Sequence, residues 1–159
     1  MINTCRSKNV RVFADAVVNH MTGNGNDMNP THCTSQAVWG SKNSSAGSPF
    51  YTHGFSFENS KVTGQRPGNE NPAVPYGPLD FHCSRSLNSW TDGFILNYGW
   101  LVGLCDLNTE SDFVRQRIAD YFTELISMGI SGLRVDAAKH IAPDNLAVIF
   151  GKLKDNLGG

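Results

Sequence analysis

The sequence lacks the features that mark membrane proteins and nucleic-acid-binding proteins. No apolar run approaches the roughly 18 residues of a membrane-spanning helix. The 159 residues carry a net charge of −1 without a basic cluster. Because a nucleic-acid surface needs concentrated positive charge, neither nucleic acid nor a membrane is an expected partner. Acidic polymers are equally poor candidates, so a neutral ligand fits this charge balance best.

Cysteine is also sparse, with four residues at Cys5, Cys33, Cys83 and Cys105. The chain contains no C-x-x-C spacing and no H-E-x-x-H motif. A disulfide-dense scaffold and the common zinc motifs are therefore excluded, although one or two bridges in a secreted enzyme remain compatible. The first nine residues contain no apolar segment of a secretory signal. They are more typical of a helix end leading into a strand, so we expect the chain to begin inside a domain.

Regular apolar patterns occur near the two ends of the chain. Residues 10–18 form a nearly continuous β-branched run, which predicts a strand buried on both faces, as in a parallel sheet. A helix is predicted over 108–128, a strand over 133–137 and a second helix over 145–153. Between 21 and 103 the sequence is rich in Gly, Asn, Ser, Pro and aromatic residues, which predicts a compact, irregular subdomain. This order describes a βαβ unit with an insertion, so we expect part of a larger α/β fold.

Local signals mark the ends and buried faces of the two helices. Thr109 and Asp112 resemble a capping box, Gly129 suits the end of the first helix, and Pro143 suits the first turn of the second. The first helix is expected to bury Val114, Ile118, Tyr121, Phe122 and Leu125. The second is expected to bury Leu146, Ile149, Phe150 and Leu153.

Polar side chains gather where both predicted strands end. They are Asp15, Asn19, His20, Arg134, Asp136, Lys139 and His140. Chemistry in parallel α/β folds collects at the C-terminal ends of strands, so these residues are expected to face one cleft. Arg134 and Asp136 share a strand face, and a neighbouring guanidinium favours an ionised carboxylate, which suits a nucleophile or a stabiliser of positive charge. A structural Arg–Asp pair without chemistry is the competing interpretation.

Three short motifs resemble signatures of the α-amylase family of glycoside hydrolases. Residues 15–20 (DAVVNH) resemble its first signature and residues 132–140 (GLRVDAAKH) its second. Residues 103–110 (GLCDLNTE) resemble the motif that ends the family's inserted domain. The three occur in the family's order, and the resemblance covers nearly the whole chain. It is closest to the calcium- and chloride-dependent α-amylases.

The resemblance implies the fold class α/β. The expected architecture is a partial TIM (β/α)8 barrel, from its third strand to its fourth helix, with the irregular domain inserted after the third strand. Residues 1–20 and 107–159 would belong to the catalytic barrel, and residues 21–106 to the inserted calcium-binding domain. A full barrel takes about 250 residues, so the chain is expected to be an internal fragment.

The resemblance also implies roles for single residues. Asp136 matches the nucleophile, which forms the covalent glycosyl-enzyme intermediate of a retaining mechanism. Arg134 matches a residue that positions the nucleophile and, in chloride-dependent members, binds chloride. His20 matches a histidine that hydrogen-bonds the sugar at the cleavage point, Lys139 matches a substrate-contacting position, and Asp15 matches an aspartate with a mainly structural role.

Calcium is the expected cofactor, since it takes oxygen ligands from carboxylates, amides and carbonyls. By resemblance Asn19, Asp106 and the main-chain carbonyl of His140 supply three ligands, and the main chain near Asn97 supplies a fourth. Arg134 and His140 also count among the expected substrate-binding residues. Taken singly, Asn19 could instead make a strand-end hydrogen bond and Asp106 a helix-start contact.

The cysteines are also interpreted through the resemblance. Cys5 and Cys33 match positions that, in animal-type relatives, bridge to cysteines upstream, so both are expected to be unpaired here. Cys83 matches a position in the inserted domain whose usual partner position, near Gly99, is not cysteine. Cys105 is the alternative partner.

Two groups of ring-bearing residues have no motif around them. The aromatic residues expected to form the core of the inserted domain, rather than to stack on sugars, are Trp39, Tyr51, Tyr76, Trp90 and Trp100. The histidines expected to be surface or structural residues are His32, His53 and His82.

The implied parent enzyme is an α-amylase that hydrolyses internal α-1,4-glucosidic bonds of starch, glycogen and maltooligosaccharides. It is expected to be a monomer, secreted or acting in a digestive compartment. The acid/base glutamate on the family's fifth strand and an aspartate after the seventh match no carboxylate here, so residues 1–159 alone are expected to be inactive. An α-glucosidase or glucanotransferase, or a non-catalytic relative used for binding or assembly, are the alternative parents.

Overall fold

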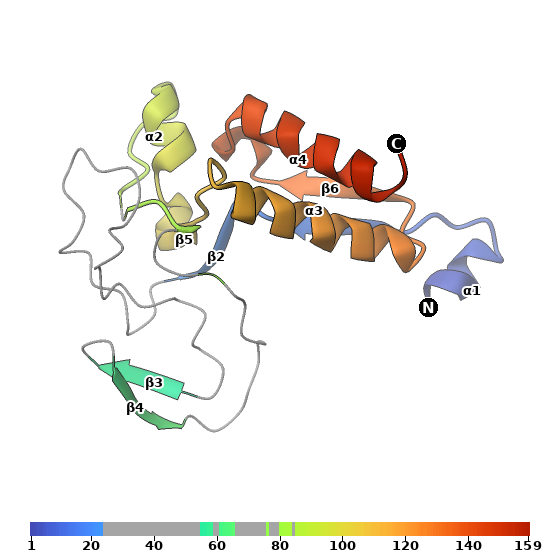
Figure 1. Cartoon of the computed structure of the whole chain (residues 1–159), viewed down its shortest axis with the longest axis horizontal. Coiled ribbons are helices and arrows are strands. Elements are labelled where there is room, and N and C mark those ends of the chain that lie inside the picture. The colour runs from blue at the N-terminus through green and yellow to red at the C-terminus, as the bar shows by residue number, and fades with distance from the viewer. Residues whose placement is uncertain (24–54, 59–60, 66–75, 77–79, 84) are drawn as a thin grey trace. The chain divides into compact units, whose positions relative to one another are not determined.

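The two ends of the chain, Met1–Asn19 and Thr109–Gly159, fold together as one unit, and His20–Asn108 form a second. We refer to them as the α/β unit and the inserted unit. The computed structural model describes residues 1–23, 55–58, 61–65, 76, 80–83 and 85–159 (Figure 1). The inserted unit thus begins at His20 and ends at Asn108, where the sequence predicted bounds of 21 and 106. Within the described ranges, no helix is long and apolar enough to cross a membrane.

The α/β unit contains the predicted βαβ arrangement. Its elements are α1 (Ile2–Arg6), β1 (Phe13–Val17), α3 (Asp112–Ser127), β6 (Gly132–Asp136), the short 3-10 helix η4 (Ala138–His140) and α4 (Pro143–Asn156). β1 and β6 pair in parallel, with Asp15 opposite Arg134 and Val17 opposite Asp136. The four predicted strands and helices are therefore confirmed, although β1 is shorter than the predicted 10–18, and α1 confirms the helix expected at the start.

The helices α3 and α4 lie side by side along the unit (Figure 1). Their buried residues are Val114, Ile118, Ala119 and Phe122 of α3, and Asn145, Ile149 and Leu153 of α4. Tyr121 and Phe150 are 42% and 43% exposed, so the prediction that both are buried is wrong. The buried face of α3 centres between Ile118 and Phe122, which leaves Tyr121 at its edge.

The start of α3 differs from the predicted capping box. The helix begins at Asp112 after Ser111, whose side chain makes no capping hydrogen bond. Thr109 is buried, and its Oγ1 accepts a hydrogen bond from Asn145 Nδ2 at 3.2 Å. Thr109 therefore joins the start of α4 to the segment before α3. The predicted capping box is wrong, because the Thr109 hydroxyl bonds to α4 instead of capping α3.

The predicted helix end at Gly129 and helix start at Pro143 are confirmed. Gly129 has φ +95° and donates its N–H to Ile126 O at 2.8 Å, and the next N–H, of Ile130, donates to Leu125 O at 3.3 Å. This pair of bonds is a Schellman motif, which needs a left-handed residue at the position of the glycine. Pro143 is the first residue of α4.

The two faces of β1 have opposite environments. Ala16 and the following Val18 are buried, whereas Phe13 and Val17 are 61% and 46% exposed. The prediction of a strand buried on both faces is wrong for this chain, because a two-stranded sheet with helices on one side leaves the other side open. That open face also bears Asp15 and, from β6, Arg134.

The described part of the inserted unit consists of short elements. They are β2 (His20–Gly23), β3 (Phe55–Glu58), β4 (Lys61–Gln65), α2 (Gly93–Tyr98), the 3-10 helix η3 (Leu101–Gly103) and β5 (Leu104–Asp106). β2 pairs antiparallel with β5, with His20 opposite Asp106, and β3 pairs antiparallel with β4. The irregular subdomain of the sequence analysis therefore contains two small ladders and a helix, which its composition did not indicate.

The aromatic residues of this unit have mixed environments. Trp100 is buried and Tyr76 packs edge-on against Phe81, as expected for core residues. Trp90 is largely exposed, so its assignment to the core is wrong. Trp39 and Tyr51 lie outside the described residues.

Candidate active site

Arg134 and two carboxylates form the centre of the candidate site on the open face of β1 and β6. Arg134 Nη1 contacts Asp15 Oδ1 at 2.5 Å, and Arg134 Nη2 contacts Asp136 Oδ1 at 2.9 Å. The parallel register explains this geometry, since Asp15 lies directly opposite Arg134 and Asp136 follows two residues later on the same face. One guanidinium thus bridges a carboxylate on each strand.

The bridge is polar but only partly shielded from water. The side chains of Arg134 and Asp15 are 63% and 60% exposed, whereas that of Asp136 is 32% exposed. The pKa of Arg134 is raised above its ordinary value, first by its hydrogen bond to Asp15 and then by that to Asp136. Arg134 is therefore cationic at all ordinary pH values, and its guanidinium holds one carboxylate on each strand.

A left-handed residue follows Asp136 directly. Ala137 has φ +50° and ψ +26°, and the chain then enters η4. Because a non-glycine residue in this region costs about 1 kcal/mol or more, the turn is specified by its surroundings rather than by local preference. Within η4, Lys139 is exposed and His140 is buried.

Asn19 and His140 come together at the end of the β1 segment. Both are almost fully buried, and Asn19 Nδ2 donates a hydrogen bond to the main-chain oxygen of His140 at 3.2 Å. The strand-end hydrogen bond proposed as an alternative for Asn19 is therefore present. It brings an amide and a main-chain carbonyl, both expected calcium ligands, into direct contact.

The other predicted site residues belong to the inserted unit. His20 is half-buried in β2, Asn97 is half-buried in α2, and Asp106 is 1% exposed at the end of β5. Within the described residues, no cluster of three or more His, Cys, Asp or Glu side chains gathers as in a metal centre. The predicted calcium ligands include one such side chain, Asp106, so they would not form a cluster of that kind.

His82 contacts a predicted site residue, although the sequence analysis assigned it no functional role. It is buried, and its Nδ1 lies 2.5 Å from Asp106 Oδ2. Of the two expectations for His82, the surface position is wrong and the structural one is confirmed. No local motif surrounds His82, and its partner is 24 residues away, so the sequence held no signal for this contact. His32 and His53 lie outside the described residues.

The structure does not contain the Cys83–Cys105 disulfide that the sequence analysis considered. Cys83 is disulfide-bonded, whereas Cys5 and the buried Cys105 are not. Cys105 is therefore not the partner of Cys83, and that alternative is wrong. Cys33 lies outside the described residues.

Comparisons with known proteins identify relatives that match nearly the whole chain. The sequence profile described as alpha amylase, catalytic domain, matches residues 1–150. The chain is 37% identical to an alpha-amylase of Tribolium castaneum and 39% identical to one of Tenebrio molitor, in each case over 98% of this chain and 26% of the relative. It thus spans about a quarter of the length of these relatives.

Solved structures agree with the sequence comparison. The chain is similar to alpha-amylase I of Eisenia fetida, with a TM-score of 0.62 and 30% identity, over 96% of this chain and 26% of that one. A mutant of the same Eisenia protein has been solved in complex with maltohexaose. A Geobacillus thermoleovorans alpha-amylase, 18% identical with a TM-score of 0.58, shares the fold.

Proposed function

Because the chain belongs to the family of alpha-amylase catalytic domains, we propose that it is a segment of a glycoside hydrolase that cleaves internal α-1,4-glucosidic bonds. Starch, glycogen and maltooligosaccharides are the proposed substrates. The names of the relatives and the maltohexaose complex of the Eisenia protein support this substrate class. Since the chain covers a quarter of its relatives, the activity is proposed for the protein that carries it, acting outside the cell or in a digestive compartment.

The observation that best supports this function is the bridge from Arg134 to Asp15 and Asp136. A carboxylate nucleophile must be held in one orientation, and a guanidinium hydrogen-bonded to one of its oxygens does this. Asp136 is the last residue of β6, at the C-terminal strand end where catalytic residues of (β/α)8 barrels lie. We assign β1 and β6 to the third and fourth barrel strands, with their open face toward the barrel interior.

The proposed reaction has two steps. In the first, an Asp136 carboxylate oxygen attacks the anomeric carbon, the glycosidic C–O bond breaks, and the leaving oxygen takes a proton from an acid. In the second, water loses a proton to the conjugate base and its oxygen displaces Asp136 from the anomeric carbon. The acid/base group is assigned to a part of the protein outside residues 1–159.

His20, Lys139 and His140 are the proposed substrate-binding residues. An imidazole and an ammonium group donate hydrogen bonds to hydroxyl oxygens, which suits a sugar that carries no charge. His140 has a buried side chain and its main-chain oxygen accepts from Asn19, so its contribution is assigned to η4, the short helix that carries the exposed Lys139. Chloride, if it binds Arg134, would use guanidinium donors other than those directed at Asp15 and Asp136.

Calcium is the proposed cofactor, held by Asn19, Asp106 and the main-chain oxygens of His140 and Asn97. These groups are all oxygen donors of the kinds that calcium prefers, so the donor set fits the ion. Asn97 lies in the last turn of α2, where main-chain carbonyls lack partners within the helix. Bound calcium would hold these four chain positions in fixed places.

The replacement Asp136→Asn tests the proposal in the protein that carries this chain. The amide is a poor nucleophile, so starch hydrolysis should fall by a factor on the order of 10⁴ or more. Asp144→Asn, which makes the same change on an exposed residue in the first turn of α4, should leave the rate unchanged.

Two results would contradict the proposal. Undiminished activity of the Asp136→Asn variant would remove the nucleophile assignment. Starch hydrolysis by residues 1–159 alone, if abolished by the same replacement, would show that the acid lies within this chain.

A further inference from the structure

His82 and Asp106 form a buried, hydrogen-bonded side-chain pair inside the inserted unit. The Nδ1–Oδ2 distance is 2.5 Å, and the two side chains are 0% and 1% exposed. A carboxylate only accepts hydrogen bonds, so Nδ1 of the imidazole is the donor. A charge-assisted bond of this kind is among the stronger ones in proteins, and it fixes the rotation of the carboxylate about its Cβ–Cγ bond.

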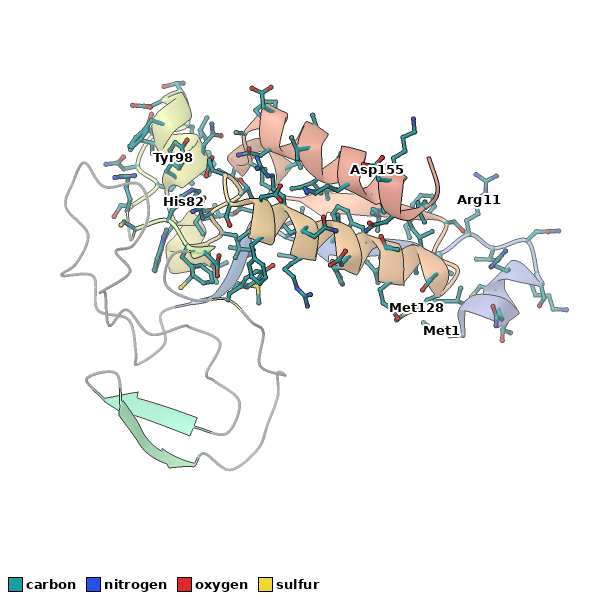
Figure 2. All side chains as sticks on the ribbon, viewed as in Figure 1. Met1, Arg11, His82, Tyr98, Met128 and Asp155 are labelled. Atoms are coloured by element: carbon teal, nitrogen blue, oxygen red, sulfur yellow. The ribbon has the colours of Figure 1, made fainter. Side chains whose placement is uncertain are left out.

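Three further contacts hold His82 in place, two through its main chain and one through its ring. The backbone N–H of His82 donates to Asp106 O at 3.0 Å, and the backbone O of His82 accepts from Trp100 Nε1 at 3.2 Å. The imidazole also packs edge-on against the ring of Tyr98, with centroids 4.7 Å apart (Figure 2). His82 is thus bound to Asp106 through both main chain and side chain, which leaves the pair one relative orientation.

We propose that His82 is a positioning residue that orients the Asp106 carboxylate as a calcium ligand. This inference rests on the calcium site in the proposed function. With Oδ2 bonded to His82, the carboxylate that would bind the ion is held in one rotation. Carboxylates that bind metals are commonly held in this way by a hydrogen-bonded partner, and loss of the partner lowers metal affinity about 10- to 100-fold.

The location of His82 favours this role over a purely stabilising one. Tyr98, against which the imidazole packs, directly follows Asn97, the proposed carbonyl ligand in α2. The same histidine therefore contacts the segments that bear two of the four proposed ligands. A buried apolar pair could fill this space without fixing a carboxylate, whereas a ligand needs a fixed orientation.

The test measures calcium binding rather than turnover. The protein that carries this chain is stripped of calcium with a chelator and titrated with CaCl₂ in a calorimeter. In Asn, the Nδ2 amide lies two bonds from Cβ, as Nδ1 does in His82, whereas the Gln amide lies one bond farther out. His82→Asn should keep most of the affinity, and His82→Gln should lose about 10- to 100-fold.

Two controls separate positioning from stability. Trp100→Phe removes another hydrogen bond to His82 without touching the carboxylate, so it should lower the unfolding midpoint in chelator but not the calcium affinity. Asp106→Asn should lose calcium affinity at least as strongly as His82→Gln.

The outcomes are distinguishable. If Asp106→Asn weakens calcium binding but both His82 variants bind as tightly as the wild type, the inference is overturned and the proposed site stands. If Asp106→Asn has no effect on calcium binding, the proposed site itself fails. Equal losses for His82→Asn, His82→Gln and Trp100→Phe would indicate general destabilisation and would also overturn the inference.

Discussion

The α/β unit and the described part of the inserted unit differ in how their buried residues are arranged along the sequence. In the α/β unit, apolar residues that recur along α3 and α4, such as Ile118, Phe122 and Ile149, make the core. Both units bury polar groups, such as Asn145 in the α/β unit and His82 in the inserted unit, but the helix described in the inserted unit is too short to repeat apolar residues, and Cys83 adds a disulfide there. Apolar packing leaves a periodic trace in a sequence, whereas a single polar contact between distant residues does not.

The difference also predicts how each unit responds to mutation. An apolar core loses stability in proportion to the volume removed, because its neighbours relax only partly. A unit of short elements depends more on tight backbone approaches and on individual hydrogen bonds. In the α/β unit, the stability lost on replacement should follow the buried volume of the residue. In the inserted unit, it should follow the space around the backbone.

Phe122→Ala should have the largest effect on stability. Phe122 is fully buried in α3, so its truncation should cost about 3–5 kcal/mol in the free energy of unfolding. Tyr121→Ala, at the next position and partly exposed, should cost about 1 kcal/mol. Urea denaturation measures both, and equal costs would contradict the assignment of Phe122 to the core.

Gly99→Ala tests a tight approach in the inserted unit. A Cβ at Gly99 would lie 2.5 Å from Ile95 O, the acceptor of the Gly99 N–H, and 3.1 Å from Leu87 Cα. The replacement should cost about 1–3 kcal/mol, since backbone must move to accommodate the methyl group.

Gly93 supplies the matched control at the other end of α2. A Cβ there meets nothing within 4 Å, so Gly93→Ala should be neutral or stabilising by about 0.5–1 kcal/mol. Denaturation of both variants under the same conditions makes the comparison. Similar effects at the two glycines would show that space at the end of α2 is not limiting.

Asp112→Asn should give the smallest effect, and one that depends on pH. Lys152 lowers the pKa of Asp112, mainly through a side-chain hydrogen bond, and the two side chains lie 3.0 Å apart at Oδ1 and Nζ. A lowered carboxyl pKa means that the ionised form stabilises the fold above the ordinary value of 3.8, and that this contribution is lost as pH falls through the lowered pKa.

Thermal unfolding across pH checks this prediction. The wild type should melt slightly above Asp112→Asn at pH 7, and the difference should vanish in acid and shrink in high salt. Lys152→Met completes a double-mutant cycle. A difference that grows as the pH falls would contradict the assigned sign.

The sequence was sufficient to predict the elements of the α/β unit and the shared face of Arg134 and Asp136. Both depend on local periods, 3.6 residues for helices and two for strands. The ion pair between Arg134 and Asp15 was not predicted, because it depends on the register of two strands separated by more than a hundred residues. The burial of Tyr121 was mispredicted because the packing partner decides which edge of a helical face is covered.

In the inserted unit the same reasoning recovered less. The helix α2 was missed, although Asp92 accepts hydrogen bonds from the N–H groups of Phe94 and Ile95 as its N-cap. A helix of six residues is too short to show a periodic face, so its capping residue was the only local signal. The contact of His82 with Asp106 had no local signal at all, and only the folded chain reveals it.

The pairing of Asp15 with Arg134 has a consequence for the fidelity of folding. In a strand, a slip of one residue moves every side chain to the opposite face, so a misaligned β6 would direct Arg134 toward the buried side of the sheet. A charged group there, away from both carboxylates, would be heavily penalised. The ion pair proposed to prepare the nucleophile therefore also distinguishes the correct strand alignment from its nearest competitors, before any substrate is present.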